Sequence, residues 1–548
     1  MVHFLLLLST CQVTNESCAL HCKLLLLLVR ELSERNHDET TCVKSYCRHA
    51  NPIDSKVYVQ YNCLEVYLSP VSFPLDLRQH RRVLVGNPPM SLPFRYLTVG
   101  DYVDGTIQQL QENSVNVQHL KIGKYYLHGS DLEGSHMISL FRAAEEHDRL
   151  NEISLSGVNI EDEETFTALV HLLQKRKWKT VHFVSCRGKV IQSLSAAPVD
   201  AEAIRIKTCE MSQIDFCSLG QHLQRNCHLE SLEVFEENLN GPNVEPLMEG
   251  LEKTRSLRML EMSYCSFDTH GSTNFARGLE KNKSLDRLSL PGCELEDEQL
   301  AEILTSLSHH PDLRSLQLHR NHCGQKGAEA LARMLSSTSR IRHLDFSFQQ
   351  IERDDEKLDT PLLAVGLRAN TSLEFLKLSF NKFDDEDAKM ISKSLKGHPC
   401  LKELDLRANS IKDDGASSIA ENLVNFKYSS SPSSLRKLYL YGNDFGDMGG
   451  QALSHAIRRN VDLQVLNMDY KLASYDEVQF YICLNRAGRR LIMMRHHSDN
   501  NAVVPPSSLY PLVLARTSDI SKKSRGVCHQ SDLLYTLIRH AGMGVINR

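Results

Sequence analysis

The sequence predicts an α/β solenoid, with a parallel β-sheet on the concave face of a horseshoe and α-helices on its convex face. Three observations support this prediction: a dominant period of 28 residues, period-two apolar alternation in the first half of each unit, and helical spacing in the second. One strand and one helix can close a single turn of such an array. Because helices are wider than strands, the sheet should lie on the inside of the curve.

The strand half of the unit recurs along most of the chain. The steps between the most regular units are 28, 28, 28, 32, 28, 34 and 28 residues. These units begin at Leu257, Leu285, Leu313, Ile341, Leu373, Leu401, Leu435 and Leu463, and more divergent ones at Leu229, Ala201, Trp178, Leu150 and Val117. Since a single unit cannot bury its apolar face, stacked units must share one continuous core.

Each unit reads L-x-x-L-x-L-x-x-N/C, which assigns a direction to every strand side chain. Positions four and six alternate as a strand with one buried face, as Leu316 and Leu318 do. The ninth position is Asn at Asn321, Asn381, Asn409 and Asn443, and Cys at Cys186, Cys209, Cys265 and Cys293. An inward amide there can satisfy backbone groups where the chain leaves the strand, and a buried thiol fits the same space. We therefore interpret these cysteines as packing residues.

The second half of each unit has the spacing of an amphipathic helix. Ala328, Leu331 and Leu335 fall on one face, which predicts a helix around residues 327–335. Similar helices are expected over residues 300–307, 388–395, 416–423 and 451–457.

The two long steps indicate insertions, which we place in the connection that leads into the next strand. One, at residues 352–360, is acidic, and the other, at residues 425–434, is polar and rich in serine. Longer solenoid loops often contact partners, but neutral drift explains them equally well.

This pattern resembles the ribonuclease-inhibitor-like subfamily of leucine-rich repeats, a type that also occurs in NOD-like receptors and in the Ran GTPase-activating protein. The resemblance covers roughly residues 117–485 and is most regular from Leu229 to Leu472. It implies the horseshoe fold but leaves function open, because this fold hosts many partners. No G-x-x-x-x-G-K-[ST] motif occurs, so a nucleotide-driven receptor is unsupported.

We divide the 548 residues into three parts: an N-terminal region of uncertain fold (residues 1–110), a domain of about 12–13 repeats (residues 111–485), and a basic C-terminal cap or tail (residues 486–548). The tail could instead be a docking motif for a partner or a membrane surface. The overall net charge of −5 is too small to suggest a nucleic-acid binder, and no apolar run approaches a transmembrane length.

The concave face is the expected binding surface, because strand positions three, five and seven point out of the sheet. These positions are rigid, so contacts there cost little ordering entropy. Aromatic residues and arginine are the usual interface anchors. The candidate residues for binding a partner are Phe375, Lys377, Arg407, Lys437, Tyr439 and Tyr441.

The N-terminal region offers weaker signals. Cys18 and Cys22, and Cys42 and Cys47, lie near histidines, but their spacing is wider than the usual zinc knuckle, so we expect no metal. Packed thiols favour a reducing compartment, and we expect a cytoplasmic location, with secretion through a cleaved signal as the alternative. Sequons at Asn15, Asn282 and Asn370 matter only in that case.

These observations favour a protein-interaction scaffold or recognition module with no cofactor and no catalysis of its own. No G-x-S-x-G, H-E-x-x-H or helix-opening G-x-G-x-x-G motif is present. A Ran-type GTPase-activating regulator, with a small GTPase as partner, is an alternative by resemblance, although that family's acidic tail is replaced here by a basic one. A secreted recognition protein and a substrate receptor of a ubiquitin ligase are further alternatives.

Overall fold

The computed structural model describes residues 99–111, 118–123, 132–196, 198–337, 340–349, 358–424 and 434–486. All described residues lie in the unit Pro74–Arg548. The N-terminal cysteines, Asn15 and the predicted C-terminal cap lie outside the described residues, apart from Arg486 itself.

One parallel sheet of 13 strands runs through the described repeats in the order β1-β2-β4-β6-β7-β8-β9-β10-β11-β12-β13-β14-β15. Its strands are β1 His119–Gly123, β2 Glu152–Ser156, β4 Trp178–Val184, β6 Ala201–Lys207, β7 Ser231–Phe235, β8 Met259–Ser263, β9 Arg287–Ser289, β10 Ser315–Gln317, β11 His343–Asp345, β12 Phe375–Lys377, β13 Glu403–Asp405, β14 Lys437–Tyr439 and β15 Val465–Asn467. A second, two-stranded sheet joins β3 Asn159–Ile160 to β5 Arg187–Gly188. The predicted fold class is confirmed.

The register of the sheet confirms the repeat frame, including its weakest units. The third position of each repeat pairs with the third position of the next, from His119 with Glu152 at one end to Lys437 with Val465 at the other. The divergent unit that begins at Ala201 obeys the same rule, since Ala203 pairs with Thr180 on one side and with Ser231 on the other.

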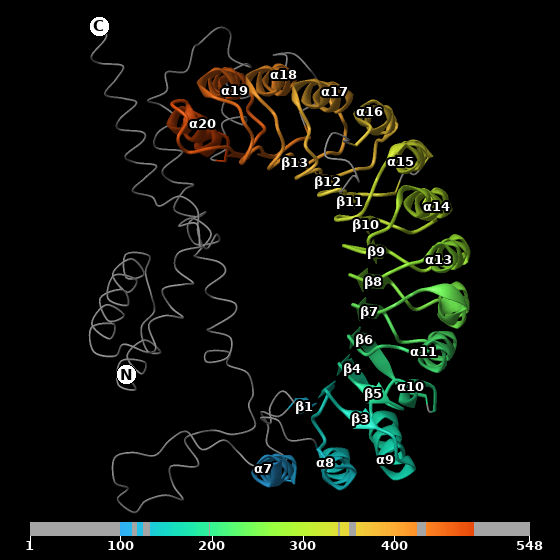
Figure 1. Ribbon diagram of the computed structural model, residues 1–548. Helices are drawn as coiled ribbons and strands as arrows, with labels where there is room; N and C mark the ends of the chain where they lie inside the picture. Colours follow the sequence, from blue (N-terminus) through green and yellow to red (C-terminus); the bar gives the residue numbers. More distant parts are fainter. Residues whose placement is uncertain are drawn as a thin grey trace, which may run out of the picture. The chain divides into compact units, whose positions relative to one another are not determined.

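Helices alternate with these strands and follow the outer side of the repeat array, while the strands follow its inner side (Figure 1). They are α7 Val99–Gln111, α8 Gly134–Glu146, α9 Glu163–Gln174, α10 Ser193–Ala196, α11 Gln213–Arg225, η2 Gly241–Val244, α12 Glu245–Lys253, α13 Thr269–Lys281, α14 Asp297–Leu307, α15 Gln325–Ser337, α16 Thr360–Ala369, α17 Asp385–Ser394, α18 Asp413–Leu423, α19 Asp447–Arg459 and α20 Tyr475–Arg486. None of the described helices is long and apolar enough to cross a membrane.

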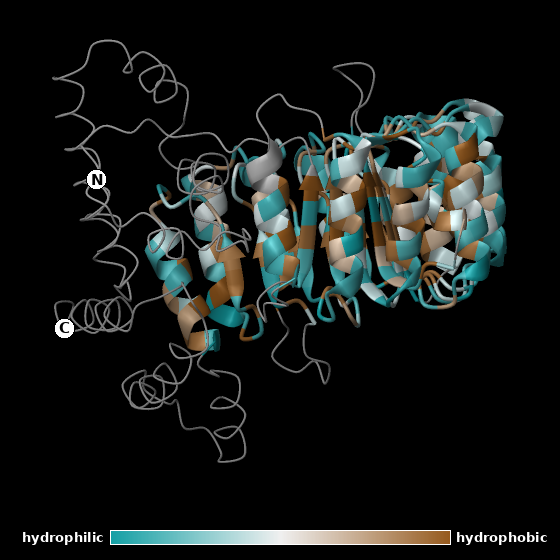
Figure 2. Cartoon of the chain, turned by 90° about the horizontal axis from the view of Figure 1, so that it is seen from below, coloured by the Kyte–Doolittle hydropathy of each residue, from teal (hydrophilic) through white to brown (hydrophobic). Residues whose placement is uncertain are grey.

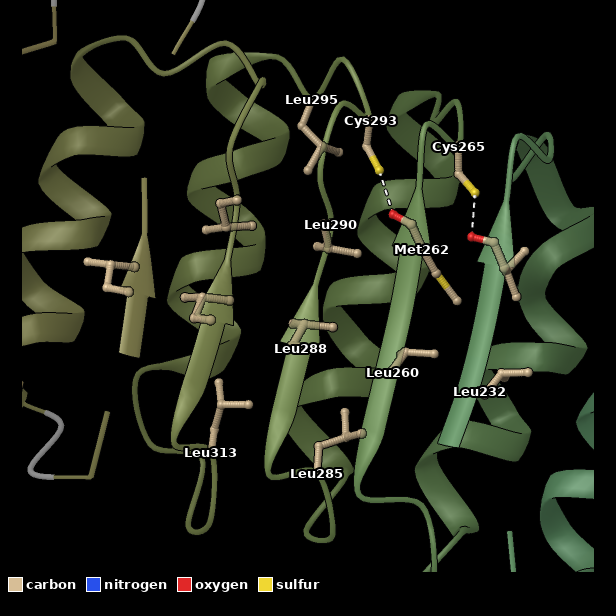
Figure 3. Close-up of a cluster of buried hydrophobic side chains, with 14 of the residues drawn as sticks. Leu232, Leu260, Met262, Cys265, Leu285, Leu288, Leu290, Cys293, Leu295 and Leu313 are labelled. Atoms are coloured by element: carbon tan, nitrogen blue, oxygen red, sulfur yellow. Dashed lines mark hydrogen bonds between the residues drawn. The ribbon is translucent and has the colours of Figure 1, made fainter. Parts of the chain in front are cut away.

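The core lies between the two layers and consists of the predicted positions. Leu260 and Leu288 at position four, and Met262 and Leu290 at position six, are fully buried in successive repeats (Figure 3). Leu316, at position four of the next repeat, is also fully buried. Burying each such side chain contributes roughly 1.5–3 kcal/mol. Helices carry hydrophilic residues beside hydrophobic ones, as burial of a single face requires (Figure 2). Within α7, Val103 and Leu110 belong to the same core.

The ninth position completes backbone hydrogen bonding where each strand ends, as predicted. Asn321 donates through Nδ2 to the carbonyls of Leu290 and Leu318 at 2.9 Å each, and its Oδ1 accepts from the Leu295 N–H at 3.1 Å. The Cys293 thiol donates to the Met262 carbonyl at 2.9 Å (Figure 3). Burial raises the pKa of that thiol to about 12, so it stays protonated and acts as a packing residue.

Glu237 is an exception that the frame did not single out. It occupies the ninth position of its repeat with only 3% of its surface exposed. Its carboxylate accepts hydrogen bonds from the backbone N–H groups of Cys209 and Met211, the second at 2.9 Å. Burial raises the pKa of Glu237, while these two hydrogen bonds oppose that rise. Glu237 therefore performs the acceptor half of the asparagine's role.

The acidic insertion lies elsewhere in its repeat than the sequence suggested. β11 ends at Asp345 and α16 begins only at Thr360, whereas β12 ends at Lys377 and α17 already begins at Asp385. The extra residues therefore follow the strand rather than precede the next one, and α16 is shorter than α15. The placement was wrong because a step length shows that residues are added but not on which side of the helix. The second insertion does fall between α18 and β14.

Candidate protein-binding site on the concave sheet

The six candidate residues come together on three neighbouring strands. The register places Phe375, Glu403 and Lys437 in one row across β12, β13 and β14. Lys377, Asp405 and Tyr439 form the next row. Arg407 and Tyr441 lie two residues beyond Asp405 and Tyr439, just past the ends of β13 and β14.

Two ring contacts hold the aromatic members of this group. The Phe375 ring meets the edge of the His343 ring from β11, with centroids 4.4 Å apart. The guanidinium of Arg407 lies over the Tyr439 ring at 5.3 Å from its centroid. Such contacts restrict ring rotation, so Phe375 and Tyr439 are held in defined orientations.

Every candidate cation already has a carboxylate partner from the sheet. Lys377 Nζ lies 3.2 Å from Asp345 Oδ2, and Lys437 Nζ lies 2.9 Å from Glu403 Oε2. The guanidinium of Arg407 donates to both oxygens of Asp405, with Nη2 2.6 Å from Oδ2. The surface is therefore close to neutral rather than basic.

Neighbouring groups keep these side chains in their ordinary protonation states at neutral pH. The hydrogen bond that Arg407 donates to Asp405 raises the pKa of Arg407, and the one that Lys437 donates to Glu403 raises the pKa of Lys437. Burial raises the pKa of Tyr439, so its phenol stays neutral. Burial also lowers the pKa of His343, which leaves a neutral imidazole against Phe375.

The carboxylates were missed as members of the site, although the sequence contained a signal for them. Glu403 and Asp405 stand at positions three and five, and the repeat step places them beside Lys437 and Tyr439. Asp405 is only 2% exposed because Arg407 covers it, so it supports the surface rather than facing a partner. Ser379 and Ser347 are also buried and hydrogen-bond to each other at 3.0 Å.

Part of each of the six candidate side chains remains exposed. Tyr441 is 40% exposed, Lys377 and Arg407 are exposed, and Phe375, Lys437 and Tyr439 are half-buried. Among the described residues, no group of three or more His, Cys, Asp or Glu side chains is placed to hold a metal ion. Aromatic residues and arginine are enriched at protein interfaces.

Comparison with known proteins agrees with this architecture. The profile described as Leucine Rich repeat matches residues 369–392, 397–420 and 431–454, which include all six candidate residues. NACHT, LRR and PYD domains-containing protein 12 of Mus musculus is 28% identical over 235 residues, 42% of this chain and 22% of that protein. Ribonuclease inhibitor of Sus scrofa is 29% identical over 242 residues, 43% of this chain and 50% of the inhibitor.

Dynein regulatory complex subunit 5 of Macaca fascicularis is 39% identical over 105 residues, 19% of this chain and 20% of that subunit. The matched part of this chain thus spans from about a fifth to half the length of these relatives. A solved internalin structure from Listeria monocytogenes aligns with 70% of this chain and 100% of its own at 16% identity and a TM-score of 0.39. The described repeats thus form a leucine-rich-repeat solenoid that is similar to ribonuclease inhibitor and to the NACHT, LRR and PYD domains-containing protein.

Proposed function

We propose that this chain is a protein-binding module that holds a partner on the concave surface formed by Phe375, Lys377, Arg407, Lys437, Tyr439 and Tyr441. The stacking of Arg407 on Tyr439, fixed by two hydrogen-bonded oxygens of Asp405, carries the proposal. A rigid aromatic and arginine cluster loses little side-chain entropy on binding. Leucine-rich-repeat proteins generally mediate protein–protein interactions, which supports a binding role over a catalytic one.

Affinity capture with matched variants tests this proposal. The full chain and its Tyr439→Ala/Tyr441→Ala variant are used as bait, and bound proteins are quantified by mass spectrometry. Because interface tyrosines often contribute 1–3 kcal/mol, about tenfold loss of the specific partners is expected. Met448→Ala, which removes a 74% exposed side chain at the start of α19, is the control and should retain them. An unchanged partner list for the double variant contradicts the proposed surface.

A second candidate role is that of a subunit in a stable multiprotein assembly. The similarity to the Macaca fascicularis dynein regulatory complex subunit, at 39% identity, exceeds the 28–29% to the other relatives described above, although it covers a shorter stretch. Coexpression with the other subunits of that complex, followed by gel filtration, tests this role. Co-elution that is lost in Tyr439→Ala/Tyr441→Ala supports it, whereas separate elution of the wild-type chain contradicts it.

A cytoplasmic location is part of the proposal. The described cysteines are free, and five of them are buried: Cys186, Cys209, Cys265, Cys293 and Cys323. Two of the three sequons are also inaccessible, since Asn282 Nδ2 donates to the Leu251 carbonyl at 2.7 Å and Asn370 Nδ2 to the Leu335 carbonyl at 2.9 Å. Both features suit a reducing compartment without glycosylation. A cleaved leader found by mass spectrometry of the native N-terminus contradicts this location.

The Ran-type alternative has a direct test of its own. Hydrolysis of GTP by a Ran-type GTPase is measured with and without the full chain. A binding module that is not an activator leaves the rate unchanged, and a large acceleration contradicts the proposal of a non-catalytic role.

A further inference from the structure

The eighth position of the repeat, directly after each strand, has a left-handed backbone. Its φ lies between 49° and 78° in eleven successive repeats, at Gly157, Ser185, Thr208, Glu236, Tyr264, Gly292, Arg320, Phe348, Phe380, Ala408 and Gly442. Glycine adopts this conformation freely, whereas a bulky side chain makes it strained. Large residues at this position therefore act against local stability.

Four repeats near the middle of the array nevertheless carry large side chains there. Tyr264, Arg320, Phe348 and Phe380 follow β8, β10, β11 and β12, and we call them the aromatic ridge. Tyr264 is 52% exposed and Phe380 is 53% exposed, so burial of apolar surface does not compensate for the strain. Strained residues that gain little from packing are concentrated at functional sites.

The ridge is continuous because each side chain contacts the next. A Cβ on Gly292 would lie 2.7 Å from two atoms of the Tyr264 ring, which therefore lies against the Gly292 backbone. Beyond it, Arg320 Nη1 donates to Tyr264 Oη at 3.3 Å, and the Arg320 guanidinium lies 5.1 Å from the Phe348 centroid. The Phe348 and Phe380 rings are 5.5 Å apart. Because Gly292 has no side chain, the Tyr264 ring can lie across it and reach Arg320.

Arg320 gives the ridge its chemical preference. It is exposed, and within the described part of the chain no carboxylate lies within 4.0 Å of its guanidinium. This contrasts with Lys377, Arg407 and Lys437 on the concave face, which all have carboxylate partners. An arginine held between a phenol and a phenyl ring keeps N–H groups free for a carboxylate, while the rings offer apolar surface on either side.

We propose that the aromatic ridge docks an acidic segment of a partner protein, in which a carboxylate pairs with Arg320 and flanking apolar side chains pack on Tyr264, Phe348 and Phe380. This second surface lies at the strand ends rather than on the sheet face. It extends the proposed binding role but does not depend on the concave surface, and separate variants distinguish the two.

Peptide selection tests the ridge directly. A phage-displayed library of random 12-residue peptides is selected on the full chain and depleted on its Arg320→Gly/Phe380→Gly variant. The enriched peptides are expected to contain Asp or Glu beside aromatic or aliphatic residues. A fluorescein-labelled peptide from this set should bind at least tenfold more weakly to Arg320→Gly or to Phe380→Gly, as followed by anisotropy, and more weakly in high salt than in low salt.

The left-handed backbone at the eighth position makes it possible to separate loss of peptide binding from loss of stability. Because glycine suits φ values of 59° and 60°, Phe380→Gly and Arg320→Gly should melt no lower than the wild type, so weaker binding is not unfolding. Glu236→Gly changes the same position outside the ridge and should bind the peptide normally. Tyr439→Ala/Tyr441→Ala should also leave peptide binding unchanged.

Four outcomes overturn the proposal. The first is enrichment of basic or uncharged peptides, and the second is equal peptide binding by the wild type and the ridge variants. The third is a wild-type dimer, detected by light scattering, that Phe380→Gly converts to monomer. The fourth is peptide binding by the Asp354→Asn/Asp355→Asn variant that the wild type does not show. The third would assign the ridge to a second copy of this chain, and the fourth to its own acidic insertion.

Discussion

At the residue scale, the side chain three residues before each repeat accepts hydrogen bonds from backbone N–H groups at the start of that repeat. Different residue types perform this role in different repeats. Asn282 accepts from the Ser284 and Leu285 N–H groups at 2.9 and 3.0 Å. His310 stands at the same position, and its Nδ1 accepts from the Asp312 and Leu313 N–H groups at 3.4 and 3.2 Å. An imidazole can accept through Nδ1 only while that nitrogen carries no proton. This capping role therefore requires neutral histidine, whereas asparagine performs it at any pH.

His310 should make the fold sensitive to acid. Burial, together with Lys283, lowers the pKa of His310 to about 4 against 6.5 for an ordinary histidine, and Asp312 opposes this shift weakly. Between pH 6.5 and pH 4 the His310 imidazole is protonated in the unfolded chain but neutral in the folded chain. The free energy of unfolding therefore falls as the pH decreases from 6.5 to 4, and His310 does not change it above pH 6.5. The loss from this group is about 3 kcal/mol across the window.

The variant His310→Asn should weaken the acid sensitivity by the share of His310, while His398, which caps the equivalent position of its own repeat, keeps its share. Stability at pH 7.5 should be preserved, because asparagine caps the equivalent position elsewhere. Urea unfolding at pH 7.5, 6 and 5 measures both effects. His309→Asn changes the exposed neighbour and should follow the wild-type profile. Parallel pH profiles for the wild type and His310→Asn would show that the buried imidazole does not govern the acid response.

At the element scale, several helices are capped by the repeat before them. Asp413, in the first turn of α18, accepts through Oδ1 from the Gly446 and Gly449 N–H groups at 2.8 and 2.7 Å, at the start of α19. Asp385 of α17 does the same for Lys412 and Gly415 of α18. Glycine is required at two of these positions, because a Cβ on Gly449 would lie 2.9 Å from Asp413 Oδ1 and a Cβ on Gly415 would lie 2.5 Å from Asp385 Oδ1.

Helix α17 is capped by residues of its own repeat, as α14 is. The preceding helix α16 begins late and is capped by its own Asp359, whose side chain accepts from the Leu362 N–H at 3.1 Å. With no carboxylate supplied from that side, α17 forms its own capping box between Asp384 and Asp387.

Loss of a cap supplied by the neighbouring repeat should destabilise the array although no core residue changes. Asp413→Ala leaves two N–H groups of α19 without partners and should cost about 1–2 kcal/mol of unfolding free energy. Asp414→Ala removes an exposed acidic residue from the same turn that caps nothing in α19, and should cost no more than about 0.5 kcal/mol. Chemical denaturation of the two variants provides the comparison, and equal losses would refute the role assigned to Asp413.

A feature of the fold or of the candidate site can be predicted from the sequence when the residues that determine it lie within one repeat. Features that depend on two repeats, or on the backbone conformation, are harder to predict. The alternation of Leu376 and Leu378 and the constant step were enough to predict the sheet, the core and the ninth position, because each repeat encodes them locally. The pairing of Lys437 with Glu403 needed two repeats aligned across a 34-residue step. The aromatic ridge needed a backbone conformation that no residue type reveals, since glycine, arginine and phenylalanine share it.

At the scale of the whole array, each repeat contacts mainly its two neighbours, so stability is close to a sum of local terms. The ridge lies on the repeats of β8 to β12 and the concave surface on those of β12 to β14, and the two meet at one strand that carries both Phe375 and, just beyond it, Phe380. Binding at either surface should therefore stabilise the other, because both stiffen the repeat of β12.

A defect in one repeat should spread only to its neighbours. Leu316 is fully buried on β10 between Leu288 and Leu344, and Leu316→Ala should cost roughly 2–5 kcal/mol. Hydrogen exchange followed by mass spectrometry should show faster exchange in β9 to β11 and α14 to α16, with little change in β2 to β6. Gln317→Ala, on the exposed face of the same strand, should leave exchange unchanged. Equal acceleration from β2 to β15 would mean that the array unfolds as one cooperative unit, and the two binding surfaces would then be coupled through global stability rather than through the repeat they share.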